Sequence, residues 1–217
     1  MVGDIVHICN RGVNKQTIFC GVNDYMRFVE SLYKFNNKGD SLRSRSLFDN
    51  LPPQEKIVEI LKWSLLPNHY HLLVYEKVEG GVTQFAKRIG NGYTKYFNIK
   101  NKRSGYLFQN KAKIIKVEDD AHFLYLPYYV ELNPLDLFDT AWRDEGIHQK
   151  KRAEVFLSTY RWSSYQDYVG KKNFPMIINK DLFFDLFETN KAAYGKEMWK
   201  LLEATPVSTW HVDTGGI

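Results

Sequence analysis

The stretch that decides the fold is Leu65-Leu66-Pro67-Asn68-His69-Tyr70-His71-Leu72-Leu73-Val74. Its closing aliphatic run is typical of a buried strand, and the Pro-Asn pair before the first histidine is a turn signal. Residues two apart on a strand face the same side, with Cα atoms roughly 6.7 Å apart. His69 and His71 would therefore project together and could bind one divalent metal ion, with Tyr70 on the other face. The plainer alternative is a solvated strand face that happens to carry two of the chain's six histidines.

The composition predicts a folded globule with an anionic partner. Of 217 residues, 44% are hydrophobic and 15% are aromatic, and the formal net charge is +5. That length suffices for one sizeable core, or for one domain with an appendage. Because no apolar run could span a bilayer and the N-terminus does not resemble a signal peptide, we expect a cytoplasmic protein with no membrane partner. The two cysteines, Cys9 and Cys20, have neither zinc-type spacing nor a disulfide framework.

Hydrophobic periodicity predicts an α+β fold, in which a central antiparallel sheet carries helices mainly on one face and a helical tail follows at the C-terminus. The histidine strand and the strand before it are joined tightly enough to form an antiparallel hairpin. The polar segment 36–53 is expected to be a loop or insertion. Other strands are predicted at 5–9, 57–63 and 106–117, and helices at 24–37, 82–99, 121–133 and within 181–203.

The helix predicted to end at Asn133 carries a group of tyrosines. Residues four apart lie on one helix face, so Tyr129 and Asn133 would point the same way. Tyr125 would share that face only if the helix passes Pro127, which either kinks the helix or lies in its first turn. Tyr128 is turned away by about 100°. Aromatic packing is the commoner role of such a tyrosine pair.

A basic segment lies between residues 87 and 117, where every charged residue is a lysine or an arginine. Such a run is usually a solvated face. Here aromatic residues are interleaved with it, which favours a track for nucleic acid. The candidate DNA-binding residues are Lys87, Arg88, Lys95, Arg103, Lys111, Lys113 and Lys116.

Together these stretches resemble the HUH nucleases, specifically the single-tyrosine transposases and their REP-associated relatives. The histidine stretch resembles the pattern MPNHxHLL, with Leu66 in place of Met. Similar matches are HxxNRG from His7, YTKYFNxKxxRxGxLFQ from Tyr93, and WSSY from Trp162. Tyr129, followed four residues later by an amide and then a proline, is similar to the nucleophile helix of that family. The resemblance covers about residues 5 to 170.

The resemblance implies a ferredoxin-like (RRM-like) HUH nuclease domain over residues 1–170, with a C-terminal helical extension of unknown role over 171–217. It implies that Tyr129 is the catalytic nucleophile and that His69, His71 and Asn133 bind the metal. Mixed nitrogen and oxygen ligands suit Mg²⁺ or Mn²⁺. We therefore expect an enzyme, a metal-dependent endonuclease and strand transferase for single-stranded or hairpin DNA, acting through a 5′-phosphotyrosine as a monomer or homodimer.

Two alternatives stay open at this point. One is a DNA-hairpin-binding protein without turnover, and the other is an HUH nickase of the replication-initiation or relaxase type. His7 could belong to the site or could simply pack in its strand. The family often has a histidine where this chain has Glu131, so a role for Glu131 is open as well. A zinc deaminase is disfavoured because no His-x-Glu with Cys-x-x-Cys occurs, and no P-loop or GxGxxG motif is present.

Overall fold

A four-stranded antiparallel sheet lies at the centre of the protein, whose computed structural model describes residues 1–39, 54–204 and 207–210. Its strands are β1 (Ile5–Arg11), β2 (Val58–Leu66), β3 (His69–Glu76) and β4 (Lys113–Lys116), arranged in the order β2-β3-β1-β4. The β2–β3 hairpin closes with Leu66 opposite His69, which confirms the predicted tight turn. Most of the predicted loop at 36–53 lies outside the described residues.

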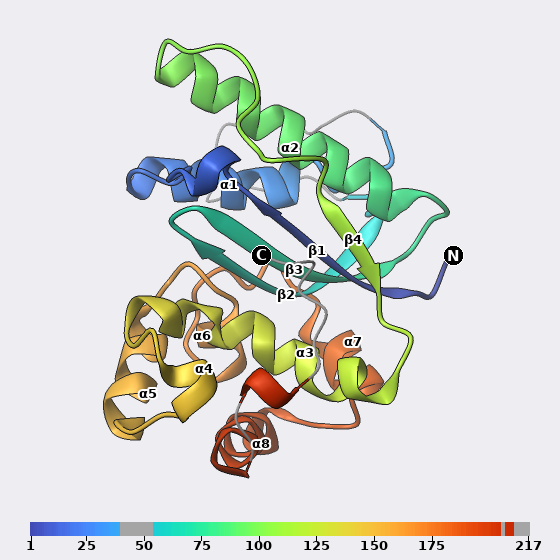
Figure 1. The fold of residues 1–217 in the computed structure, drawn as a ribbon. Coiled ribbons are helices and arrows are strands. Elements are labelled where there is room, and N and C mark those ends of the chain that lie inside the picture. Colours follow the sequence, from blue (N-terminus) through green and yellow to red (C-terminus); the bar gives the residue numbers. More distant parts are fainter. Residues whose placement is uncertain (40–53, 205–206, 211–217) are drawn as a thin grey trace.

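Helices cover both faces of this sheet, as Figure 1 shows. On one face lie α1 (Val22–Lys34) and α2 (Gly81–Lys100), where Phe28 packs on Tyr70 with 4.8 Å between ring centroids. On the other lies α3 (Asp120–Leu132), where Tyr129 meets His71. The α+β class and the antiparallel sheet are confirmed, but the expectation of helices mainly on one face is wrong. Because β2 is buried along its whole length, it needs cover on both sides.

Apart from the short helix η1 (Val13–Lys15), the remaining helices of the described residues follow α3. The predicted C-terminal helices are confirmed as α7 (Lys180–Leu186) and α8 (Lys191–Ala204), which are seen with α3 on the same side of the sheet in Figure 1. None of the helices in the described residues is long and apolar enough to cross a membrane. The other helices after α3 are η2 (Asn133–Leu137), α4 (Trp142–Glu145), α5 (Lys150–Thr159), α6 (Tyr165–Tyr168) and η3 (Val207–Thr209).

Strand β4 is much shorter than the predicted strand at 106–117. Leu107 and Phe108 are adjacent and both buried, which breaks the alternation that a half-buried strand requires. Phe108 forms only an isolated bridge with Gly12, and regular pairing begins at Lys113. The predicted strand is therefore wrong over residues 106–112.

Helix α3 runs through Pro127, so this proline is not in the first turn. The helix stops at Leu132, and the chain tightens into η2 at Asn133. The α-helix therefore ends one residue before the predicted end at Asn133, which itself lies in the first turn of η2.

A buried lysine joins β2 to the helices of the second face. A register shift at Leu61 directs Lys62 towards this layer, and its Nζ lies 3.4 Å from a carboxylate oxygen of Glu131 in α3. Three aromatic rings surround the same nitrogen, with centroids 2.9 Å (Tyr168), 4.0 Å (Phe183) and 3.6 Å (Tyr194) away. We call Lys62, Glu131 and these three rings the lysine cage.

Candidate metal and tyrosine site

Strand alternation brings the histidines of β3 together on the α3 face of the sheet. The ring centroids of His69 and His71 are 5.1 Å apart, as expected from their spacing. In the antiparallel register Cys9 lies opposite His71 and Arg11 lies opposite His69, so these β1 side chains point to the same face. Tyr70 points to the other face.

Both histidines are held through Nδ1. The Nδ1 of His69 lies 2.6 Å from the side-chain oxygen of Asn68, which can only accept, so this Nδ1 carries the proton. The Nδ1 of His71 lies 2.9 Å from Nε2 of His7. The Nε2 of His71 is buried and has no hydrogen-bond partner within the described residues. Partners that fix Nδ1 and leave Nε2 for a ligand bond are the usual surroundings of a metal-binding histidine, so this pair fits a divalent metal.

The two imidazoles are neutral at physiological pH. Burial lowers the pKa of His69 from 6.5 to about 4, and the positive charge of Arg11 adds to this effect. Burial also lowers the pKa of His71 well below its ordinary value. Neutral imidazole is the form that binds metal, so neither histidine has to lose a proton first.

We expect the metal-free protein to lose stability as the pH falls from 6.5 towards 4. In this window the unfolded chain protonates position 69 while the folded chain does not, so the free energy of unfolding decreases as the pH falls. For His69, with a folded pKa of about 4, the loss is about 3 kcal/mol. Urea unfolding across this pH range should show a shallower dependence for His69→Gln. The control His148→Gln, at an exposed histidine, should keep the slope of the parent chain, and a parental slope in His69→Gln would contradict the assignment.

Helix α3 directs one of its three candidate tyrosines towards the histidines. The Tyr129 ring meets His71 edge-on, with 5.7 Å between centroids. Tyr128 instead stacks on Tyr194, and Tyr125 stacks on Trp210. Because the helix passes Pro127, Tyr125 lies on nearly the same helix face as Tyr129. Its ring packs on Trp210 and not on the histidines.

Arg143 in α4 is a further residue of this site, and sequence reasoning missed it. Its guanidinium carbon lies 5.0 Å from the centroid of the Tyr129 ring. Its Nε and Nη2 donate to the two carboxylate oxygens of Asp136 at 3.0 and 2.9 Å. Burial raises the pKa of the Tyr129 phenol, and the adjacent Arg143 opposes that rise. Arg143 lies in no recognisable motif, so no sequence signal pointed to it.

Asn133 lies beside Tyr129, with its amide already in use. Its Nδ2 donates to the backbone oxygen of Tyr129 at 2.7 Å, and its Oδ1 accepts from Nη2 of Arg143 at 2.8 Å. For Asn133 to bind a metal through this oxygen, Arg143 would have to release it.

A second group of donor atoms overlaps the histidine pair. His7, Cys9 and His71 each place one potential ligand atom so that all three lie within 4.8 Å of one another, and all three residues are buried. This group could hold a metal ion. Sequence reasoning set Cys9 aside for lack of zinc-type spacing, although the two-residue spacing of His7 and Cys9 on one strand could have indicated it.

Glu131 belongs to the lysine cage and not to the histidine site. It follows Tyr129 by two residues, which turns it about 200° around the helix. It accepts hydrogen bonds from the hydroxyls of Ser164 and Tyr194 and pairs with Lys62. Its role is therefore to fix α3 against the sheet and the C-terminal helices.

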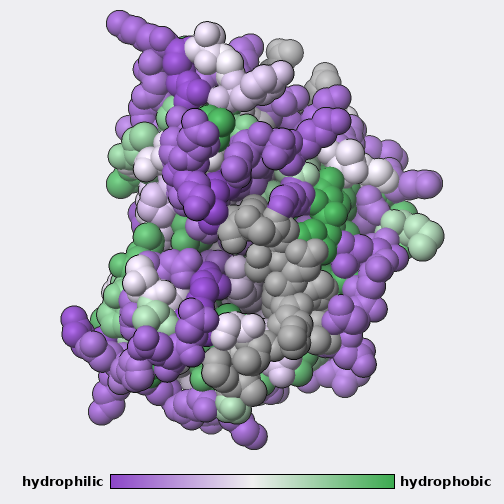
Figure 2. Space-filling model, in the orientation of Figure 1, coloured by the Kyte–Doolittle hydropathy of each residue, from purple (hydrophilic) through white to green (hydrophobic). Residues whose placement is uncertain are grey.

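The predicted basic residues divide into two groups. Arg88 donates to backbone oxygens of the segment after α1, Arg103 donates to Gln16 and to the oxygen of Tyr106, and Lys116 pairs with Asp4. The exposed group without an ion pair or hydrogen bond among the described residues consists of Lys87, Lys95, Lys111 and Lys113. Hydrophilic residues dominate the surface over α2 in Figure 2.

Comparisons with known proteins match this chain in structure but not in sequence. No protein-family model and no curated protein matches the sequence. Among solved structures, the chain is similar to a REP-associated tyrosine transposase bound to a REP hairpin. The two chains are 12% identical with a TM-score of 0.44, and the match covers 82% of this chain and 85% of the other. A likeness of this extent concerns overall shape and carries nothing about the chemistry of the site.

Proposed function

We propose that this protein is a metal-dependent, single-strand DNA endonuclease and strand transferase of the transposase type, with Tyr129 as its nucleophile. The observation that carries the proposal is the edge contact between Tyr129 and His71, whose buried Nε2 has no partner within the described residues. A tyrosine ring from α3 thus contacts an imidazole of β3 that has an open nitrogen. The motifs in the histidine and tyrosine stretches support the same reading.

The chain's own residues account for the transfer step. The Tyr129 oxygen attacks a phosphodiester, the bond from phosphorus to the 3′ oxygen breaks, and the phenol's proton ends on the released 3′-hydroxyl. A free 3′-hydroxyl can later attack the 5′-phosphotyrosine, so strands are joined without ATP. Because a phenol with an ordinary pKa near 10 is only about a thousandth ionised at neutral pH, the positive charge of Arg143 favours the reactive form.

His69 and His71 would hold the metal through Nε2, and Asn133 would join them if Arg143 releases its oxygen. Mg²⁺ or Mn²⁺ bound there would act as a Lewis acid on the phosphate oxygens. The DNA would follow the exposed lysines of α2, Lys87 and Lys95, and those just before and at the start of β4, Lys111 and Lys113. Arg88, Arg103 and Lys116 would add positive charge from fixed positions.

The direct test is incubation with a pool of single-stranded and hairpin oligonucleotides in the presence of Mn²⁺, followed by mass analysis. We expect a covalent protein–DNA adduct together with a fragment that ends in a 3′-hydroxyl. Binding of DNA without any adduct would favour a hairpin-binding protein without turnover.

Removing either histidine should abolish metal-dependent cleavage. His69→Ala and His71→Ala each delete one of the two nitrogen ligands, and we expect Mn²⁺ binding by titration calorimetry to weaken at least about tenfold. His148→Ala, at an exposed histidine, serves as the control. Cleavage at the parental rate in either variant would contradict the metal assignment.

Replacing Arg143 should slow adduct formation by about a hundredfold, the usual cost of one preorganised charge-stabilising donor. Arg143→Met removes the charge that opposes the rise in the pKa of Tyr129, so the rate should also require a higher pH. Arg152→Met removes an exposed arginine that contacts Gln149 and should change neither the rate nor the pH profile. If the pH dependence of the rate of adduct formation is unchanged in Arg143→Met, this arginine has only a structural role.

A further inference from the structure

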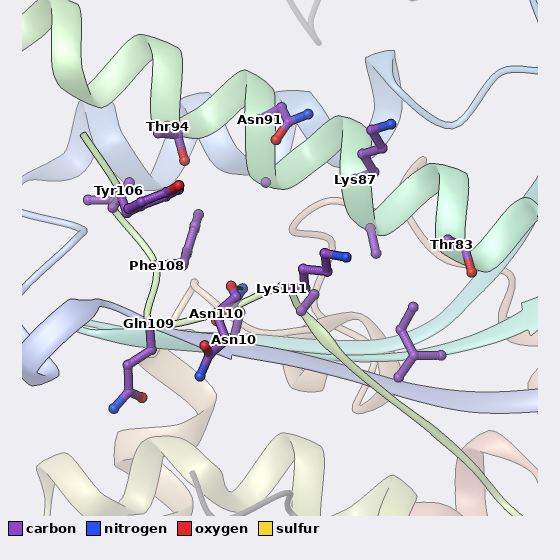
Figure 3. A pocket seen from close by; sticks show the side chains of 15 residues that line it. Asn10, Thr83, Lys87, Asn91, Thr94, Tyr106, Phe108, Gln109, Asn110 and Lys111 are labelled. Atoms are coloured by element: carbon purple, nitrogen blue, oxygen red, sulfur yellow. Dashed lines mark hydrogen bonds between the residues drawn. The ribbon is translucent and has the colours of Figure 1, made fainter. Parts of the chain in front are cut away.

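A hollow of about 740 Å³ lies between α2 and the segment 106–112, on the face opposite the histidine site. We call it the α2 hollow, and Figure 3 shows side chains entering it from the helix and from the segment below. Its volume is within the range of sites that bind small organic ligands.

The lining combines amides and positive charge over an apolar floor. Phe108 is buried beneath it, and Lys87 and Lys111 are exposed at its margin, with no acidic residue in the lining. The side chains of Asn91 and Asn110 are exposed and form no hydrogen bond among the described residues. An amide offers both a donor and an acceptor, which is the pattern that pairs with the polar edge of a nucleobase.

Tyr106 stands at the rim of the hollow as the most exposed aromatic side chain among the described residues. Its relative exposure is 88%. The backbone beneath it is fixed, because Arg103 donates to the oxygen of Tyr106 and Asn98 donates to the oxygen of Gly105. An exposed tyrosine ring on a fixed backbone is a stacking platform for an unpaired base.

The α2 hollow is connected to the histidine site through two adjacent residues of β1. Asn10 lines the hollow, and Arg11 lies opposite His69 in the register on the other face. Neighbouring residues of a strand point to opposite faces. A DNA strand that leaves the hollow across this end of the sheet therefore arrives beside His69.

We propose that the α2 hollow binds one unpaired nucleobase of a DNA single strand, stacked on Tyr106 and hydrogen-bonded by the amides, with Lys87 and Lys111 at the flanking phosphates. This rests on the proposed function only in taking single-stranded DNA as the ligand. It adds a fixed anchor that sets which phosphodiester reaches Tyr129.

Filling the hollow is the sharpest test, because Gly90 lines it and a Cβ added there would meet nothing within 4 Å. Gly90→Leu should fold, since leucine favours helix over glycine, yet its side chain would occupy the hollow. We expect affinity for a single-stranded oligonucleotide, measured by fluorescence anisotropy, to fall about tenfold. Gly90→Ala is the matched control and should bind within about threefold of the parent. Parental affinity in Gly90→Leu would overturn the proposal.

The stacking role of Tyr106 needs its own pair of variants. Tyr106→Ala should lose about tenfold in affinity, whereas Tyr106→Phe keeps the ring and should bind normally. Irradiation of a complex with a 5-iodouracil oligonucleotide should crosslink at Tyr106, and crosslinks found only outside the hollow would overturn the proposal.

The base site and the transferase activity can be contradicted independently of each other. An adduct at Tyr129 with unaffected Gly90→Leu and Tyr106→Ala variants would remove only the base site. Weakened binding in both, without any adduct, would remove only the transferase.

Discussion

Tyr129→Phe is expected to bind DNA and divalent metal almost normally, yet to form no covalent adduct and release no 3′-hydroxyl. The substitution removes one oxygen from a ring that contacts His71 edge-on, and leaves that packing in place. Because the phenol oxygen is the attacking atom, its loss should reduce transfer to the background level, a larger effect than any change in binding.

Two neighbouring tyrosines are the controls for this prediction. Tyr128→Phe loses a 3.3 Å hydrogen bond to Glu197, and Tyr125→Phe keeps its stacking on Trp210. Both variants should still form the adduct. Peptide mapping of a trapped complex decides the matter, since DNA attached at position 125 or 128 would overturn the assignment of Tyr129.

Glu131→Ala should destabilise the protein by about 3–5 kcal/mol, the typical cost of removing one partner from a buried ion pair. Both side chains of the pair, Lys62 and Glu131, have a relative exposure of 0%. The variant leaves the ammonium among aromatic rings and deprives the hydroxyls of Ser164 and Tyr194 of their acceptor. Urea unfolding at neutral pH measures the loss.

A solvent-exposed pair gives the matched control for the lysine cage. The Nζ of Lys150 lies 2.6 Å from Oε1 of Glu203, and the two side chains have relative exposures of 43% and 62%. Glu203→Ala should therefore lower the free energy of unfolding by less than about 1 kcal/mol. The double variant Lys62→Met with Glu131→Leu removes both buried charges and should recover much of the stability lost by Glu131→Ala. An equal cost for Glu131→Ala and Glu203→Ala would show that the cage contributes no more than a surface pair.

Local patterns predicted the centre of this fold well. The turn at Pro67-Asn68 and the aliphatic run after it specify the β2–β3 hairpin, and the two-residue period places His69 and His71 on one face. The 3.6-residue period similarly predicted α1 and α2. These features depend on neighbours in the chain, which is why the sequence alone reveals them.

The features that sequence reasoning missed depend on contacts between distant segments. Arg143 reaches Tyr129 only because α4 folds back over η2, and the register shift at Leu61 that turns Lys62 towards α3 has no local signal. The strand predicted from residue 106 fails because Leu107 and Phe108 both bury themselves beside α2. The roles of the catalytic and metal-binding residues remain predictions.

The lysine cage restricts how the segment after residue 170 can be exchanged during evolution. Phe183 and Tyr194, which supply two of the three rings around Lys62, lie beyond residue 170, whereas Lys62 and Glu131 lie before it. A related chain could not acquire or discard this segment as an independent module, because Lys62 of β2 and Glu131 of α3 would then keep only one of the three rings around them. We therefore expect related chains to have a lysine at position 62 only where they also have the helices that enclose it.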